Sequence, residues 1–133
     1  LLMLKAFKQW SLPPFDLVVP VPLGRGGLRH RGYNQALLIA QKTAAFLKCN
    51  VDCSHFTKTK KTKPQIGLTR SERQKNLRGA FSIKNSQVFR GKTVLLVDDV
   101  YTTGATVAEG AKTLSRAGAA SVIVLTFART VAL

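Results

Sequence analysis

The sequence predicts an α/β fold in which a mostly parallel, twisted sheet is flanked by helices. Short apolar runs typical of buried parallel strands occur at residues 17–21, 94–97 and 121–127. Apolar residues at helical spacing follow the first two runs, so strands and helices alternate along the chain. A chain of 133 residues, 45% of them hydrophobic, supports one domain with a core of its own.

The N-terminal residues 1–15 are predicted to be a lead segment that precedes the domain at residues 16–133. The chain opens on Leu1, which suggests a fragment of a longer protein, and Pro13 and Pro14 end any helix begun before them. Leu17–Pro22 then forms a predicted buried strand that two prolines terminate, because proline cannot donate to a sheet ladder.

Arginines follow this first strand in a glycine-rich loop. Arg25 and Arg31 place cations where a pyrophosphate can be held by charge-assisted hydrogen bonds. Asn34 is predicted to cap the next helix. The core-facing positions predicted for that helix are Leu37, Ala40, Ala44 and Leu47.

Two cysteines, Cys49 and Cys53, follow this helix without a second pair or a histidine cluster to complete a metal site. We expect reduced thiols and no zinc. His55, beside Phe56, is expected at the surface or at the edge of the core.

Residues 57–79 are rich in lysine and arginine and contain one acid, Glu72. Such a stretch buries little, so we expect a long, mobile, cationic loop with a short helix at 71–77 capped by Ser71. Two roles fit it: a lid over pyrophosphate, or a grip on a nucleic-acid backbone. The cations assigned to that role are Lys58, Lys60, Lys61, Lys63, Arg70, Arg73 and Arg78.

The second half centres on residues 93–106. A strand leads into Asp98 and Asp99, and a loop of hydroxyl residues then opens a helix. Backbone N–H groups converging at a helix N-terminus bind phosphate, while neighbouring carboxylates can accept hydrogen bonds from sugar hydroxyls or help to hold Mg²⁺. The predicted phosphate-binding residues are Thr102, Thr103, Gly104, Ala105 and Thr106.

The other elements predicted in the second half are again strands and a helix. A short strand is predicted at 79–83, a turn at 84–87, and a helix after residue 106 with Val107, Ala111, Leu114 and Ala117 toward the core. Gly118 is the expected C-terminal cap, and residues 121–127 form the last strand. Ligands of such parallel units bind at the carboxyl ends of the strands.

The formal net charge of +15 favours a polyanionic partner, either a small polyphosphate or a single strand of DNA or RNA; the alternative is that much of the excess charge is solvated surface without such a partner. No apolar run approaches the roughly 20 residues that cross a bilayer, and no signal peptide is recognisable, so we expect a cytoplasmic location.

Residues 94–106 resemble the phosphoribosyl-diphosphate (PRPP) motif of type I phosphoribosyltransferases. Together with the blocks at 16–35 and 64–81, they resemble the ComF family of competence-associated proteins of that fold. The resemblance implies that Asp98 and Asp99 are catalytic residues that bind the ribose hydroxyls. It assigns the 5-phosphate to residues 102–106, the pyrophosphate to the loop of Arg25 and Arg31, and Mg²⁺ to bound PRPP, with both aspartates available to share it.

The implied function is binding of PRPP or another phosphorylated ribose in DNA uptake during natural competence. The associated activity is pentosyl transfer, a glycosyltransferase reaction, to an acceptor that the sequence does not identify. A second hypothesis is a single-stranded DNA-binding module whose nucleotide site is vestigial or regulatory. The zinc module usual in the family does not occur in this sequence, nor does a clear hood segment for a nucleobase.

Overall fold

The computed structural model describes residues 9–24, 34–60, 62–63, 67–101 and 104–129. The strands are β1 (Leu17–Pro20), β2 (Asn50–Val51), β3 (Phe56–Lys58), β4 (Phe81–Ile83), β5 (Thr93–Tyr101) and β6 (Ser121–Arg129). The helices are α3 (Gln35–Leu47), α4 (Arg70–Leu77) and α5 (Ala105–Arg116), and a 3₁₀ turn, η1, spans Ser86–Val88.

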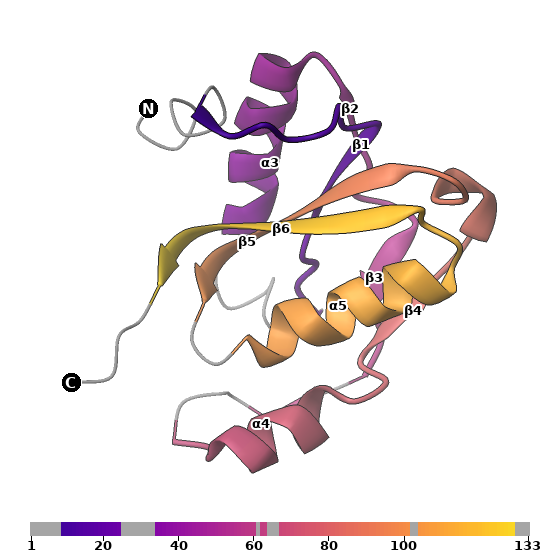
Figure 1. Ribbon diagram of the computed structural model, residues 1–133. Helices are drawn as coiled ribbons and strands as arrows, with labels where there is room; N and C mark the ends of the chain where they lie inside the picture. The colour runs from indigo at the N-terminus through magenta and orange to yellow at the C-terminus, as the bar shows by residue number, and fades with distance from the viewer. Residues whose placement is uncertain (1–8, 25–33, 61, 64–66, 102–103, 130–133) are drawn as a thin grey trace.

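The main sheet is parallel, with the strand order β2-β1-β5-β6, and β3 and β4 form a separate antiparallel pair. Helix α3 covers one face of the sheet, and α5 lies on the other with the β3–β4 pair and α4 beside it (Figure 1). The predicted α/β class is therefore confirmed. Parallel strands bring the carboxyl ends of β1 and β5 to the same edge of the sheet.

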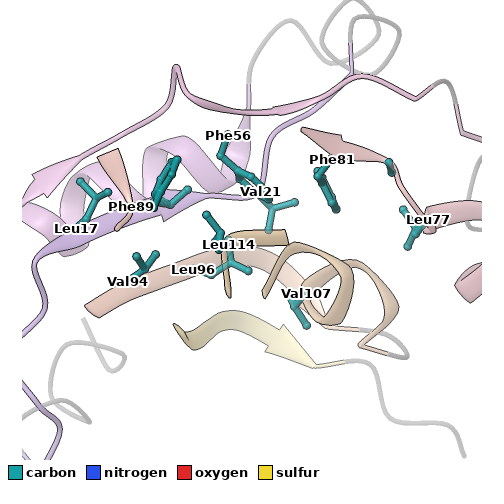
Figure 2. Close-up of a cluster of buried hydrophobic side chains, with 12 residues drawn as sticks. Leu17, Val21, Phe56, Leu77, Phe81, Phe89, Val94, Leu96, Val107 and Leu114 are labelled. Carbon is teal, nitrogen blue, oxygen red and sulfur yellow. The ribbon is translucent and has the colours of Figure 1, made fainter. Parts of the chain in front are cut away.

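Strand β5 separates two hydrophobic clusters because its side chains alternate between the faces of the sheet. Val94 and Leu96 point toward α5 and pack with Phe56 and Leu114 (Figure 2). Leu95 and Val97 point the other way, into the cluster beneath α3. All four β5 residues are almost completely buried, so the core fixes the position of the strand.

Helix α5 lies close to the sheet at Gly110. A β-carbon at this position would be 3.2 Å from Leu96 Cδ2 and 3.4 Å from Phe56 Cζ. Those distances are tighter than ordinary van der Waals contact, so glycine permits the close approach. Gly118, with a φ of 104°, ends the helix in the left-handed region, as predicted.

The predicted cap of α3 is also confirmed. Asn34 accepts a hydrogen bond from the Ala36 N–H at 3.0 Å. The buried face of α3 consists of Ala36, Ala40, Thr43 and Ala44, whereas Leu37 and Leu47 are only partly buried. The core-facing stripe is thus shifted by about one residue from the predicted one, because small side chains let the helix lie close to β1 and β5.

The β5 ladder continues through Asp98, which pairs with Thr126 of β6. Two local predictions were wrong. The helix in the basic stretch begins at Arg70 after Thr69, so Thr69 and not Ser71 is its cap. Lys58 belongs to β3 rather than to a loop. In each case tertiary pairing or a reciprocal cap outweighs the local residue preference.

Candidate functional site

Asp98 and Asp99 lie in the second half of β5, toward the carboxyl edge of the sheet. Alternation along the strand directs Asp98 to the α5 face and Asp99 to the α3 face. Asp98 is 9% exposed, and its Oδ1 accepts the N–H of Asp99 at 2.9 Å. The carboxylates of Asp98 and Asp99 therefore lie on opposite faces of β5 and not next to each other on one face.

The N-terminus of α5 lies a few residues beyond these acids. Gly104, with a φ of 81°, precedes the helix and provides no side chain to cap it. The carbonyl of Gly104 accepts the N–H of Ala108 at 2.9 Å, so the helix is already formed at this point. First-turn N–H groups, including those of Thr106 and Val107, have no partner within a helix and carry the positive end of its dipole. This end of α5 is suited to an anion.

The end of β1 adjoins the same edge. Val21 N–H donates to the carbonyl of Val97, the residue before Asp98, at 2.8 Å. Asn34 Nδ2 donates to the Val21 carbonyl at 3.2 Å, so the cap of α3 is tied to the end of β1. The predicted pyrophosphate loop therefore begins and ends beside β5, although Arg25 and Arg31 themselves lie outside the described residues, as do Thr102 and Thr103.

A hollow of about 610 Å³ lies beside the end of β1, and its walls include Pro22, Asn34 and Phe56. Lys58 and Lys84 supply cations to it. Lys58 is half-buried, and burial lowers the pKa of its ammonium group. A β-carbon at Gly24 would lie 3.7 Å from Lys58 Cδ, so the Lys58 chain reaches the start of the Arg25 loop.

A smaller hollow, of about 260 Å³, lies at the opposite end of α3. Trp10, Pro14 and Phe46 contribute to its apolar walls. It lies far from the carboxyl edge of the sheet and its described lining contains no charged side chain. The chemistry that an anionic ligand requires is therefore concentrated at the larger hollow and at β5.

The described residues 59–60, 62–63 and 67–80, called the basic segment below, are held largely by polar contacts. Lys60 Nζ donates to the carbonyl of Arg78 at 3.1 Å. Asn76 accepts the Lys63 N–H at 2.9 Å and donates to the Lys63 carbonyl at 2.8 Å. Among these described residues only Leu77 and Ala80 are buried. Lys61 lies outside the described residues.

The basic segment also contacts neighbouring elements. Gly79 N–H donates to Glu109 Oε1 of α5 at 3.0 Å. Helix α4, which carries Arg70 and Arg73, packs beside α5, and Arg78 follows it (Figure 1). Arg70, Arg73 and Arg78 therefore lie near α5, whereas Lys58, alone of the described cations in this set, lines the larger hollow.

Sequence reasoning located the acids and the helix N-terminus but missed three features of the site. Lys58 reaches the hollow because β3 pairs with β4, a pairing of residues 25 apart on average that no local pattern specifies. Asn34 binds Val21 as well as capping α3. The Glu109 contact joins residues 30 positions apart in the chain. A local sequence signal existed only for the cap.

The turn between β2 and β3 contains a second acid–base contact. Asp52 Oδ2 lies 2.6 Å from His55 Nδ1, and Asp52 Oδ1 accepts the N–H groups of Ser54 and His55. Burial by itself raises the pKa of Asp52, but the hydrogen bonds from His55 and Ser54 outweigh it and lower that pKa below its usual value of 3.8. This contact fixes the turn that leads from the main sheet into β3.

Within the described residues, His, Cys, Asp and Glu side chains do not gather into a group of three or more that could hold a metal. Cys49 and Cys53 are free thiols. A magnesium ion prefers oxygen ligands and is commonly held by one or two carboxylates together with substrate phosphates, so Asp98 and Asp99 fit an ion that arrives with a polyphosphate. None of the described helices has the length and hydropathy needed to span a membrane.

Comparison with known proteins identifies the class of protein that carries this arrangement. The model of the phosphoribosyl transferase domain matches residues 34–132, and the chain belongs to that family. The match includes the acids of β5, the first turn of α5 and the basic segment.

Several competence-associated proteins are close relatives in sequence. The DNA utilization protein YhgH of Escherichia coli K12 is 40% identical over 86% of this chain and 50% of its own length. Competence protein F of Haemophilus influenzae is 37% identical over 94% of this chain and 54% of its own. Competence protein ComFC of Bacillus subtilis is 33% identical over 85% of this chain and 44% of its own length. These relatives confirm the resemblance to the ComF family, and the chain spans about half of their length.

Solved structures support the same fold. Adenine phosphoribosyltransferase from Saccharomyces cerevisiae matches 96% of this chain and 66% of its own with a TM-score of 0.60 and 16% identity. Phosphoribosylpyrophosphate synthetase from Mycobacterium smegmatis matches 96% of this chain and 32% of its own with a TM-score of 0.60 and 20% identity. The architecture is thus that of type I phosphoribosyltransferases.

Proposed function

We propose that this chain binds PRPP, or another ribose phosphate, together with Mg²⁺ at the carboxyl edge of its main sheet. The observation that carries the proposal is the succession of Asp98 and Asp99 at the end of β5 and the N-terminus of α5, preceded by Gly104, a few residues later. A ligand with a phosphate at one end and vicinal hydroxyls beside it matches both groups.

The 5-phosphate is assigned to the first turn of α5. N–H groups of this turn and the hydroxyl of Thr106 are hydrogen-bond donors, and Gly104 lets a phosphate approach the backbone without a β-carbon in the way. Ala105 contributes only its backbone. Thr102 and Thr103 complete the assignment from the sequence motif.

Asp98 and Asp99 are assigned to the ribose hydroxyls. Their carboxylates accept hydrogen bonds, and they can also share the magnesium ion that PRPP carries. When bound, the ion would neutralise charge on the pyrophosphate. The separation of the carboxylates onto two faces of β5 suits a ribose that lies across the strand end rather than to one side of it.

The pyrophosphate is assigned to the cations around the larger hollow. Burial lowers the pKa of Lys58 because it removes water from the ammonium group, so an anion at that group would raise the pKa again and stabilise the charged form. Arg25 and Arg31 belong to the loop that starts beside Lys58. Lys58 therefore joins these arginines, rather than the nucleic-acid cations with which the sequence grouped it.

The corresponding reaction is pentosyl transfer. The bond between ribose C1 and a pyrophosphate oxygen breaks, pyrophosphate leaves with the bonding electrons, and a nucleophilic atom of the acceptor forms the new bond to C1. The aspartates would position the ribose and stabilise positive charge that develops at C1. The names of the relatives associate such a protein with DNA uptake, and we propose a cytoplasmic site of action.

Calorimetric titration with PRPP and Mg²⁺ tests the site. Asp98→Asn combined with Asp99→Asn is expected to abolish binding, whereas Glu72→Gln, which keeps its capping acceptor, is expected to leave it unchanged. Separate titrations with ribose 5-phosphate and with pyrophosphate test the ribose-phosphate part and the pyrophosphate part of the site one at a time. Lys58→Ala should weaken pyrophosphate binding and spare ribose 5-phosphate. Binding that survives the double substitution would contradict the assignment.

A second candidate function is the handling of single-stranded DNA, with the nucleotide site vestigial or regulatory. The net charge of +15 and the relatives named for DNA utilization and competence favour it. Affinity for a single strand should then fall steeply with added salt, since counterion release dominates contacts to phosphates. A salt-independent affinity would argue against this function. Both functions can coexist on different surfaces of the chain.

A further inference from the structure

Exposed cations form a stripe along the outer face of α5, away from the ribose-phosphate site. Lys112 and Arg116 are both exposed and stand four residues apart, about 6 Å along the helix axis. The inner face of α5 is buried through Val107, Gly110 and Leu114. The packing of the helix therefore directs both cations toward solvent.

The stripe continues beyond the C-terminus of α5. A β-carbon at Gly118 would lie 3.6 Å from Arg90 Cγ, so the Arg90 side chain packs beside the glycine that ends the helix. Lys92 is anchored next to it, because its carbonyl accepts the N–H of Ala120 at 2.9 Å. Arg90 and Lys92 are both exposed.

At its other end, α5 adjoins the basic segment. Helix α4 lies beside α5 in Figure 1, and Gly79 is bonded to Glu109 of α5. Arg70 and Arg78, at the two ends of α4, are exposed. The cationic path, as we name it, consists of Arg70, Arg78, Lys112, Arg116, Arg90 and Lys92.

The acids on this side of the molecule already have backbone partners. Glu72 Oε2 accepts the N–H of Thr69 at 2.9 Å, and Glu109 Oε1 accepts that of Gly79 at 3.0 Å. Within the part of the chain that the structure describes, no ion pair joins either acid to a member of the cationic path. Six cations beside these two carboxylates give the path a net positive charge.

We propose that the cationic path binds the phosphate backbone of single-stranded DNA, and that it does so independently of the ribose-phosphate site. On α5 the path is one side chain wide, which suits one backbone, whereas duplex DNA presents two backbones across a major groove about 12 Å wide. The proposal rests on the DNA-handling candidate function and specifies its surface.

Fluorescence anisotropy with a labelled oligothymidine of about 20 nucleotides tests the path. Replacing Lys112 and Arg116 together by glutamine should weaken binding on the order of ten-fold at moderate salt, and should reduce the slope of log K against log salt by about 1.4. Exchanging the two cations, as Lys112→Arg with Arg116→Lys, should preserve the affinity, because backbone contacts require charge rather than a particular side chain.

The matched control removes two exposed cations from the opposite side of the sheet. Lys42 lies on α3, and Lys48 follows it with a φ of 56°, which asparagine tolerates. Lys42→Gln with Lys48→Asn lowers the net charge by the same amount and should change the affinity less than two-fold. An equal loss of affinity in both double variants would overturn the proposal, because the affinity would then depend only on the overall charge.

The remaining outcomes distinguish a failure of the cationic path from a failure of either proposed function. Absence of single-strand binding by the unchanged protein overturns the DNA-handling function and the path with it. Equal or tighter binding of a duplex of the same sequence overturns the choice of a single strand. Titration with PRPP and Mg²⁺ should give the same result for Lys112→Gln with Arg116→Gln as for the unchanged protein, so a failed PRPP site and a failed path are distinguishable.

Discussion

The β5–α5 unit and the basic segment both carry residues for anionic ligands, but different forces hold them in place. Strand β5 is buried on both faces, and α5 packs closely against it through Gly110. The basic segment contributes Leu77 and Ala80 to the core and otherwise depends on hydrogen bonds and a capping box. Burial of apolar side chains thus fixes one region, whereas local polar contacts fix the other.

This difference has a consequence for function. A site that must hold a ribose between carboxylates and a helix N-terminus requires accurate geometry, which a packed core provides. A surface that contacts a polymeric phosphate backbone requires charge more than geometry. We therefore expect substitutions in the β5–α5 unit to affect global stability and those in the basic segment to affect local order.

The largest expected effect is that of truncating the β5 core. Leu96→Ala should lower the free energy of unfolding by about 2–5 kcal/mol, because it leaves a cavity at a fully buried position. Leu38→Ala is the matched control: Leu38 is 46% exposed, so its loss should cost less than about 0.5 kcal/mol. Urea unfolding measures both. Equal costs would mean that β5 is not the centre of the core.

Gly110→Ala tests the close approach of α5 to the sheet. Alanine at an ordinary helix position is favourable by nearly 1 kcal/mol, but here the new β-carbon would lie 3.2 Å from Leu96 Cδ2, and a shift of the buried Leu96 to make room disturbs the core. We expect a net loss of about 1 kcal/mol. Ala108→Gly, on the exposed face of α5, measures how much alanine and glycine differ in helix preference where no packing is involved. A Gly110→Ala protein that unfolds at higher urea would contradict the packing.

Thr69→Ala addresses the basic segment. It removes the hydroxyl that accepts the Glu72 N–H at 3.2 Å, and such caps contribute about 1 kcal/mol. We expect amide hydrogen exchange in α4 to accelerate roughly five-fold, while the global unfolding midpoint stays within a degree or two. Thr69→Ser keeps the acceptor and should keep the protection. A large fall in the global midpoint would show that the segment belongs to the cooperative core.

The Asp52 turn, which joins the main sheet to β3, should show an effect that depends on pH. Because the pKa of Asp52 is lowered in the folded protein, its stabilisation is complete above the ordinary value of 3.8 and disappears as pH falls through the lower folded value. Asp52→Asn should therefore cost about 1 kcal/mol near neutral pH. The difference from the unchanged protein should vanish in acid.

Urea unfolding of both proteins between neutral pH and pH 2 measures this convergence. Glu72→Gln is the control and should retain the acid dependence of the unchanged protein. A cost for Asp52→Asn that stays constant at all pH values would mean that the Asp52 carboxylate has no charge-dependent role in the turn.

Sequence patterns alone located much of the candidate site. Asp98, Asp99 and Gly104 lie within a few residues of each other, so the order of strand, acids, glycine and helix was readable without distant contacts. The same holds for Asn34, whose cap is a local hydrogen bond. Parallel topology then placed these residues at one edge of the sheet, because consecutive strands joined by helices share their direction.

Other features depended on contacts between distant residues. Asp98 lies within a strand because β6 pairs with it, although aspartate disfavours strands by itself. Lys58 faces the hollow because β3 pairs with β4 across the whole basic stretch. The cationic path requires α4 and the segment just before β5 each to lie against α5, and its six residues come from three separate segments.

The sequence by itself therefore determined the class of fold, the acids and the helix N-terminus, since each is encoded within a turn or two of chain. The tertiary structure decided which faces of β5 the acids occupy, where Lys58 points and which cations share a surface. These depend on strand pairing and packing between residues that are far apart in the chain, and such pairings leave little trace in local residue preferences.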